Sequence, residues 1–102
     1  MDTIIKKSKV ILQNHYKKQF KGLILYGSRA RGQAEESSDL DMLVLLNQPF
    51  DYFRELRTIN ELLYSLQLES KHLISAKPAS IEDYKEGSNQ LYRNAKRDGV
   101  AV

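Results

Sequence analysis

Apolar residues recur along the first part of the chain with the period of a helix and then gather into two short runs. Ile4–Ile5 and Ile11–Leu12 lie seven residues apart with lysines between them, so we expect an amphipathic helix over residues 3–19. Two apolar runs follow, each too short for a helix and each bounded by glycine or polar residues, and both are predicted to be β-strands. These runs are KGLILYG (21–27) and SDLDMLVLL (38–46).

The second half of the chain has the same alternation of periodic and continuous apolar segments. A long helix is predicted over residues 52–66, with Asp51 as its N-cap. A weaker strand is expected over residues 68–78, after which Ser80 has the character of a helix start. A last short helix is expected to end at Gly99.

The predicted order of elements is helix, strand, strand, helix, strand, helix, helix, which is typical of a small α/β or α+β domain. A chain of 102 residues suits one domain, so residues 1–102 are expected to form a single unit. We expect the two early strands to be neighbours in one sheet and the helices to cover one face of that sheet.

Composition narrows the class of protein without deciding its function. No apolar run reaches the length of a membrane span, and the N-terminal sequence is too polar for a signal peptide. Cysteine is absent, which excludes thiolate metal sites and fits a cytoplasmic protein. The net charge of +3 is concentrated in lysines near the start, which favours a solvated helix face over direct nucleic-acid binding, although the latter stays open as an alternative.

A Gly-Ser pair comes directly after the first predicted strand. At Gly27 a backbone without Cβ can turn sharply and let a ligand approach closely. Ser28 follows where a helical turn would begin, and the free backbone N–H groups at such a position favour the binding of a phosphate group. An ordinary turn would have the same two residues, so this pair alone predicts no site.

Two carboxylates lie at the start of the second predicted strand. Asp39 and Asp41 are two residues apart, so their side chains project from the same face of the sheet. Neighbouring carboxylates repel unless a cation lies between them, and oxygen ligands of this kind suit Mg²⁺. The alternative is a strand edge that merely carries charge. If the early strands pair, the Gly-Ser turn and the aspartates meet at adjacent strand ends, as metal-assisted phosphoryl or nucleotidyl transfer requires.

Gly27-Ser28, ten further residues and then Asp39-Leu40-Asp41 resemble the signature of the polymerase-β-like nucleotidyltransferases. The small size and the form GSRARG (27–32) are similar to the minimal nucleotidyltransferase (MNT) domains of that superfamily. The resemblance implies a mixed-sheet fold, two Mg²⁺ ions and a nucleoside triphosphate, usually ATP. It also implies that Gly27 and Ser28 hold the β- and γ-phosphates, and that Asp39 and Asp41 are catalytic and bind the metals.

The resemblance also implies a partner. MNT domains are typically encoded beside a HEPN-domain toxin, and known members act as antitoxins that transfer AMP from ATP to a tyrosine of that toxin, so a hetero-oligomer is expected. Arg29 and Arg31 lie beside the phosphate turn, where they would contact the triphosphate or the partner; surface salt bridges are the alternative.

A third carboxylate of the family should lie on the strand after the long helix. The only acid in residues 68–78 is Glu69, which is the candidate for the third catalytic residue, although residues 72–75 are expected to lie at the depth of the aspartates. His72 is an alternative base because its ordinary pKa suits proton transfer near neutral pH. Two interpretations therefore stay open: an active adenylyltransferase, or a weakened or inactive antitoxin that neutralises its partner by binding.

Overall fold

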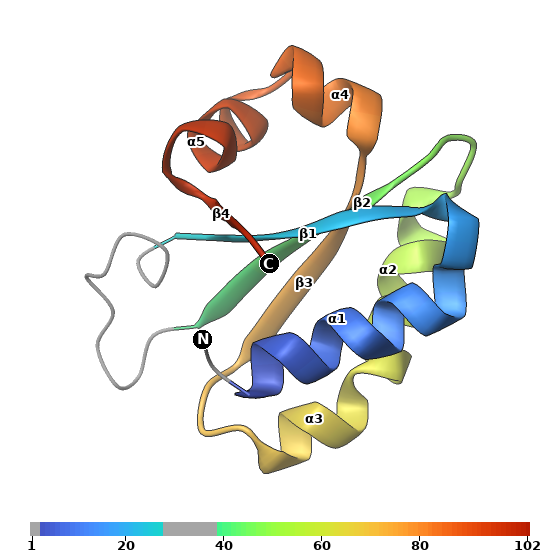
Figure 1. The fold of residues 1–102 in the computed structure, drawn as a ribbon, viewed down its shortest axis with the longest axis vertical. Coiled ribbons are helices and arrows are strands. Elements are labelled where there is room, and N and C mark those ends of the chain that lie inside the picture. Colours follow the sequence, from blue (N-terminus) through green and yellow to red (C-terminus); the bar gives the residue numbers. More distant parts are fainter. Residues whose placement is uncertain (1–2, 28–38) are drawn as a thin grey trace.

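A mixed β-sheet forms the centre of the computed structural model, which describes residues 3–27 and 39–102 (Figure 1). The strand order is β3-β2-β1-β4. β1 and β2 pair antiparallel, whereas β2 and β3 run parallel, so the expected neighbouring of the two early strands is confirmed. The strands are β1 (Phe20–Tyr26), β2 (Leu40–Leu46), β3 (Ile74–Ser80) and β4 (Val100–Ala101).

The helix starts at Asp51 and Ser80 and the helix end at Gly99 are as predicted, whereas the helix predicted over residues 52–66 is divided into two helices. Asp51 caps α2 by accepting a hydrogen bond from the Arg54 N–H at 3.0 Å, and Ser80 caps α4 through the Asp83 N–H at 3.3 Å. Gly99 follows the last helix, as predicted. The helices are α1 (Thr3–Tyr16), which continues into a 3₁₀ turn (Lys17–Gln19), α2 (Tyr52–Leu62), α3 (Tyr64–Glu69), α4 (Ile81–Glu86) and α5 (Gln90–Asp98).

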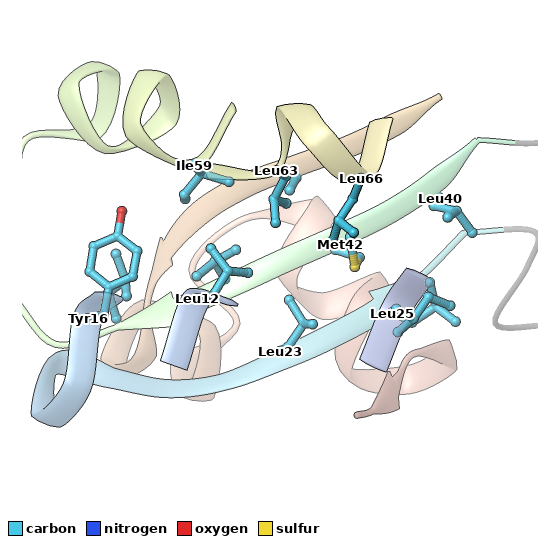
Figure 2. Packing of buried hydrophobic residues seen from close by; sticks show 13 residues of the cluster. Leu12, Tyr16, Leu23, Leu25, Leu40, Met42, Ile59, Leu63 and Leu66 are labelled. Carbon is cyan, nitrogen blue, oxygen red and sulfur yellow. The ribbon is translucent and has the colours of Figure 1, made fainter. Parts of the chain in front are cut away.

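The larger core lies between one face of the sheet and the helices α1, α2 and α3. Leu12 of α1, Met42 of β2 and Ile59 of α2 are each fully buried there, and Figure 2 shows their side chains converging between the helices and the strands. The apolar stripe of α1 that the sequence indicated is therefore the surface that packs on the sheet. This core fixes the position of β2, the strand that begins beside the two aspartates.

A second, smaller core lies on the opposite face of the sheet, under α4 and α5. It contains Ile24, Leu43, Leu45 and Ala95, and in Figure 1 these two helices lie apart from the other three. The fold class is as predicted, but the helices cover both faces rather than the one expected. The physical reason is that residues 42–46 of β2 are all buried, and a strand without polar alternation must be covered on both sides.

The third strand begins later than the sequence suggested. Residues 68–69 still belong to α3, and β3 starts at Ile74, because the helical segment resumes after a break at Leu63. The side chain of Gln67 donates to the His72 carbonyl and accepts from the Ile74 N–H, which fixes the turn between helix and strand. Pro78 lies within β3 rather than after it, which is tolerated because β3 is an edge strand.

Among the described residues, no helix combines the length and the apolar character that crossing a membrane would require.

Candidate active site

The turn after β1 and the start of β2 lie against each other. Tyr26, the last residue of β1, is the register partner of Asp41, so Gly27 follows at the level of that carboxylate. Gly27 has a φ of +79°, which disfavours any residue with a side chain. A Cβ placed on Gly27 would lie 2.6 Å from Oδ2 of Asp41, closer than atoms can approach. The predicted meeting of the glycine turn and the aspartate is thus a feature of the structure.

Asp41 lies within β2, Asp39 lies just before the strand begins, and the two differ in exposure. Asp39 is exposed, whereas Asp41 is partly buried. Burial raises the pKa of Asp41 above its usual value, the charge of Asp39 raises it further, and the charge of Lys77 opposes both effects. The folded environment therefore disfavours the charged form of Asp41. A bound cation would relieve both the desolvation and the repulsion.

The pair fits a divalent cation by its donor chemistry. Mg²⁺ usually takes one or two protein carboxylates and completes its coordination with water and substrate phosphates. Within residues 3–27 and 39–102, histidine, cysteine, aspartate and glutamate side chains do not gather into any group of three or more suited to a metal. Asp39 and Asp41 are the carboxylates that would hold Mg²⁺ here, and the backbone of Gly27 lies beside Asp41.

Glu69 does not join the aspartates. It ends α3, is exposed, and its Oε2 lies 3.5 Å from Nζ of Lys7 on α1. Both helices cover the larger core, whereas Asp41 has the same strand parity as Leu43 and Leu45 and so projects toward the α4–α5 face. His72 lies in the turn before β3, where its carbonyl accepts from Gln67 and Ser70.

Two residues beside Asp41 were not foreseen from the sequence. Tyr26 lies next to it in the ladder, and burial, followed by the charge of Asp41, raises the pKa of Tyr26 to about 12, so its phenol is neutral at physiological pH. Lys77 projects from β3 toward the same face. Tyr26 has a signal in the sequence, since it directly precedes Gly27. Lys77 has none, because its position depends on the pairing of β2 with β3.

Three predicted nucleotide-binding residues lie outside the described residues: Ser28, Arg29 and Arg31. A groove of about 610 Å³ lies elsewhere, along α2 between Phe53 and Tyr64. Because α2 covers the larger core, this groove is on the side of the sheet opposite to Asp41. It is separate from the candidate site, which is defined by the glycine turn and the carboxylates.

Comparison with known proteins identifies the family of the chain. Residues 6–102 match the family model described as polymerase beta, nucleotidyltransferase. The chain belongs to this nucleotidyltransferase family. A similar sequence is that of a Methanocaldococcus jannaschii protein that is provisionally named a protein adenylyltransferase. It is 37% identical over 70 residues, which cover 65% of this chain and 70% of that protein.

Two solved structures share the fold of this nucleotidyltransferase. One is a crystal structure of a toxin–antitoxin with AMP-PNP, with a TM-score of 0.59 and 18% identity, covering 94% of this chain and 70% of that chain. The other is a provisionally assigned nucleotidyltransferase of Sulfolobus solfataricus, with a TM-score of 0.56 and 13% identity, covering 99% of this chain and 86% of that chain. At these identities the likeness concerns the fold.

The raised pKa of Asp41 predicts a stability effect that depends on pH. Asp41→Asn removes a charge that the folded state disfavours, so the metal-free variant should have a higher free energy of unfolding than the wild type at pH 7. As pH falls through the raised pKa toward the usual value of 3.8, the wild type becomes protonated and this difference should disappear. Urea unfolding in EDTA at pH 7 and at about pH 4 measures it. A variant less stable than the wild type at pH 7, or a difference independent of pH, would contradict this description of the site.

Proposed function

We propose that this nucleotidyltransferase transfers AMP from ATP to a tyrosine hydroxyl of a partner HEPN-domain toxin, and so acts as the antitoxin of a toxin–antitoxin pair in the cytoplasm. The observation that carries the proposal is the close approach of Gly27 to the carboxylate of Asp41. This arrangement puts a backbone that can admit phosphates next to a carboxylate pair that can hold Mg²⁺. The similarity to a provisionally named protein adenylyltransferase supports a protein as the acceptor.

The proposed reaction forms one bond and breaks another. The tyrosine oxygen bonds to the α-phosphorus of ATP, and the bond from that phosphorus to the oxygen bridging to the β-phosphate breaks. Pyrophosphate leaves with the bonding electron pair, and the hydroxyl proton is released to solvent. When bound, Mg²⁺ supplies positive charge that neutralises the phosphates.

Residues of the chain would bind and orient the nucleotide. We propose that Asp39 and Asp41 hold the metal, that Gly27 and Ser28 bind the β- and γ-phosphates, and that Arg29 and Arg31 contact the triphosphate or the partner. Tyr26, whose phenol stays neutral, would form an uncharged wall beside Asp41. The exposed carboxylate of Asp39 would lie on the solvent side, where a partner protein can bring its tyrosine.

Transfer of label tests the proposal directly. The protein is incubated with Mg²⁺, the product of a neighbouring HEPN-type gene, and ATP labelled at either the α- or the γ-phosphate. We expect label on the partner from α-labelled ATP alone, and loss of labelling when the acceptor tyrosine is replaced with phenylalanine. Label from γ-labelled ATP would indicate a kinase, and an unlabelled partner with both forms would refute AMP transfer.

A second function has one observation in its favour. Beside Asp41, β3 carries Ser75 and Lys77, so within the described residues this strand supplies no third carboxylate. A domain with only two acids would serve as an antitoxin that neutralises its partner by binding. In that case neutralisation would need a stoichiometric complex and would persist when both aspartates are replaced with asparagine.

A further inference from the structure

Lys77, a positively charged residue of β3, lies on the same face of the sheet as Asp41. β2 and β3 are parallel, with Asp41 in register with Ser75 and Leu43 in register with Lys77. Partners in a parallel ladder project to the same side, so Lys77 shares the face of Asp41 one step further along the strand. On the same strand Ala79 faces the smaller core under α4 and α5, which confirms this side for Lys77 by alternation.

Lys77 is held near Asp41 without being neutralised by it. Its register partner Leu43 lies two residues from Asp41 on the same face of the neighbouring strand, so the side chain of Lys77 lies close to that carboxylate. In residues 3–27 and 39–102, however, the ion pairs link other side chains, and Lys77 has no carboxylate partner. The side chain is also partly buried, which strengthens its interaction with any anion that enters. An ammonium with this placement is available to a ligand.

A nucleoside triphosphate would bring several negative charges into this site. Two ionised aspartates balance the whole charge of one divalent cation, so with one such cation the charge of the triphosphate is left uncompensated. A second cation would need further oxygen ligands, and the adjacent strand offers the ammonium of Lys77 instead. The lysine ammonium is a compact positive charge that binds phosphate, so Lys77 would neutralise part of the triphosphate charge.

We propose that Lys77 binds the triphosphate of the bound nucleotide, and that the site holds one divalent cation between Asp39 and Asp41 instead of two. The inference rests on the proposed function only in taking this site as the nucleotide site; it does not depend on the acceptor. Lys77 is then a further nucleotide-binding residue of this site. On the face of Asp41, β3 carries Ser75 and Lys77 and no carboxylate within the described residues.

Two binding measurements without any acceptor test the proposal. AMP-PNP affinity is measured calorimetrically in the presence of Mn²⁺, and bound Mn²⁺ per bound nucleotide is counted by electron paramagnetic resonance. We expect one Mn²⁺ per nucleotide in the wild type. Lys77→Met should weaken AMP-PNP binding by about 10- to 100-fold, as for loss of a charged hydrogen bond, while Lys77→Arg should retain most of the affinity.

Lys21→Met is the matched control, because Lys21 is an exposed strand lysine at the opposite end of β1 from Tyr26. It should leave AMP-PNP affinity unchanged, and circular dichroism should show all variants folded. Two Mn²⁺ per nucleotide, unchanged affinity in Lys77→Met, or no nucleotide binding by the wild type would each overturn the inference. If nucleotide binding behaves as expected but no partner is labelled, the proposed AMP transfer is refuted and the role of Lys77 stands. If the partner is labelled but Lys77→Met binds AMP-PNP normally, AMP transfer stands and the role of Lys77 is refuted.

Discussion

Replacement of both aspartates, Asp39→Asn/Asp41→Asn, is expected to abolish AMP transfer while leaving the protein folded. Asparagine keeps the shape of each side chain but removes the two negative charges that would hold Mg²⁺. Loss of a single preorganised electrostatic contact typically costs about 100- to 1,000-fold in rate, so loss of the metal site should cost at least about 1,000-fold. The fold should survive because Asp41 is a charge that the folded state disfavours.

The rate of label transfer from α-labelled ATP measures this effect, with thermal unfolding as the check on folding. Asp51→Asn is a suitable control, since Asp51 caps α2 and asparagine caps a helix about as well. It should transfer AMP at the wild-type rate. A double variant that keeps a rate within about tenfold of wild type would exclude Asp39 and Asp41 as the metal ligands. One that loses transfer but still neutralises the toxin would favour the binding function.

Gly27→Ala is expected to have the second largest effect on transfer. The backbone at Gly27 has a φ of +79°, and the added Cβ would meet Oδ2 of Asp41 at 2.6 Å. Either the turn or the carboxylate must move, and either movement separates the phosphate-binding backbone from the metal-binding side chain. We expect transfer to fall by about 100-fold, because displacement of a catalytic group by about 1 Å has costs of that order. The free energy of unfolding should fall by about 1–2 kcal/mol.

Gly87→Ala separates the loss of stability from the loss of AMP transfer. Gly87 also has a positive φ, of +67°, but it ends α4, and its added Cβ would meet the flexible side chain of Arg93 at 2.9 Å. This variant should lose a comparable amount of stability in urea unfolding and keep wild-type transfer. If the two glycine variants lose stability equally and neither loses transfer, the contact between Gly27 and Asp41 has no part in the reaction.

The meeting of Gly27 and Asp41 was predictable because both signals are local. A strand that ends in glycine and a strand that starts with two carboxylates need only pair as neighbours for the two features to touch. The starts of α2 and α4 and the end of α5 were predictable for the same reason, since Asp51, Ser80 and Gly99 act on adjacent backbone groups.

Features that depend on distant contacts were not predictable. β3 starts at Ile74 rather than at residue 68 because the Gln67 side chain donates to the His72 carbonyl and accepts from the Ile74 N–H, which fixes the turn. Leucines at 66 and 68 suit either a helix or a strand. The register of β3 against β2 then decides that Lys77 lies on the face of Asp41, while Glu69 stays at the end of α3. Nothing in the local sequence of Lys77 distinguishes it from an ordinary surface lysine.

The central claim is that the Gly27 turn and the aspartates form one nucleotide–metal site. A crystal structure with AMP-PNP and Mn²⁺, with the metal located by anomalous scattering, tests this claim most directly. We predict one Mn²⁺ bound by the carboxylates of Asp39 and Asp41, phosphates against the backbone of Gly27, and the ammonium of Lys77 on the triphosphate. A nucleotide bound elsewhere, such as the groove along α2, or Mn²⁺ away from both carboxylates, would contradict the account.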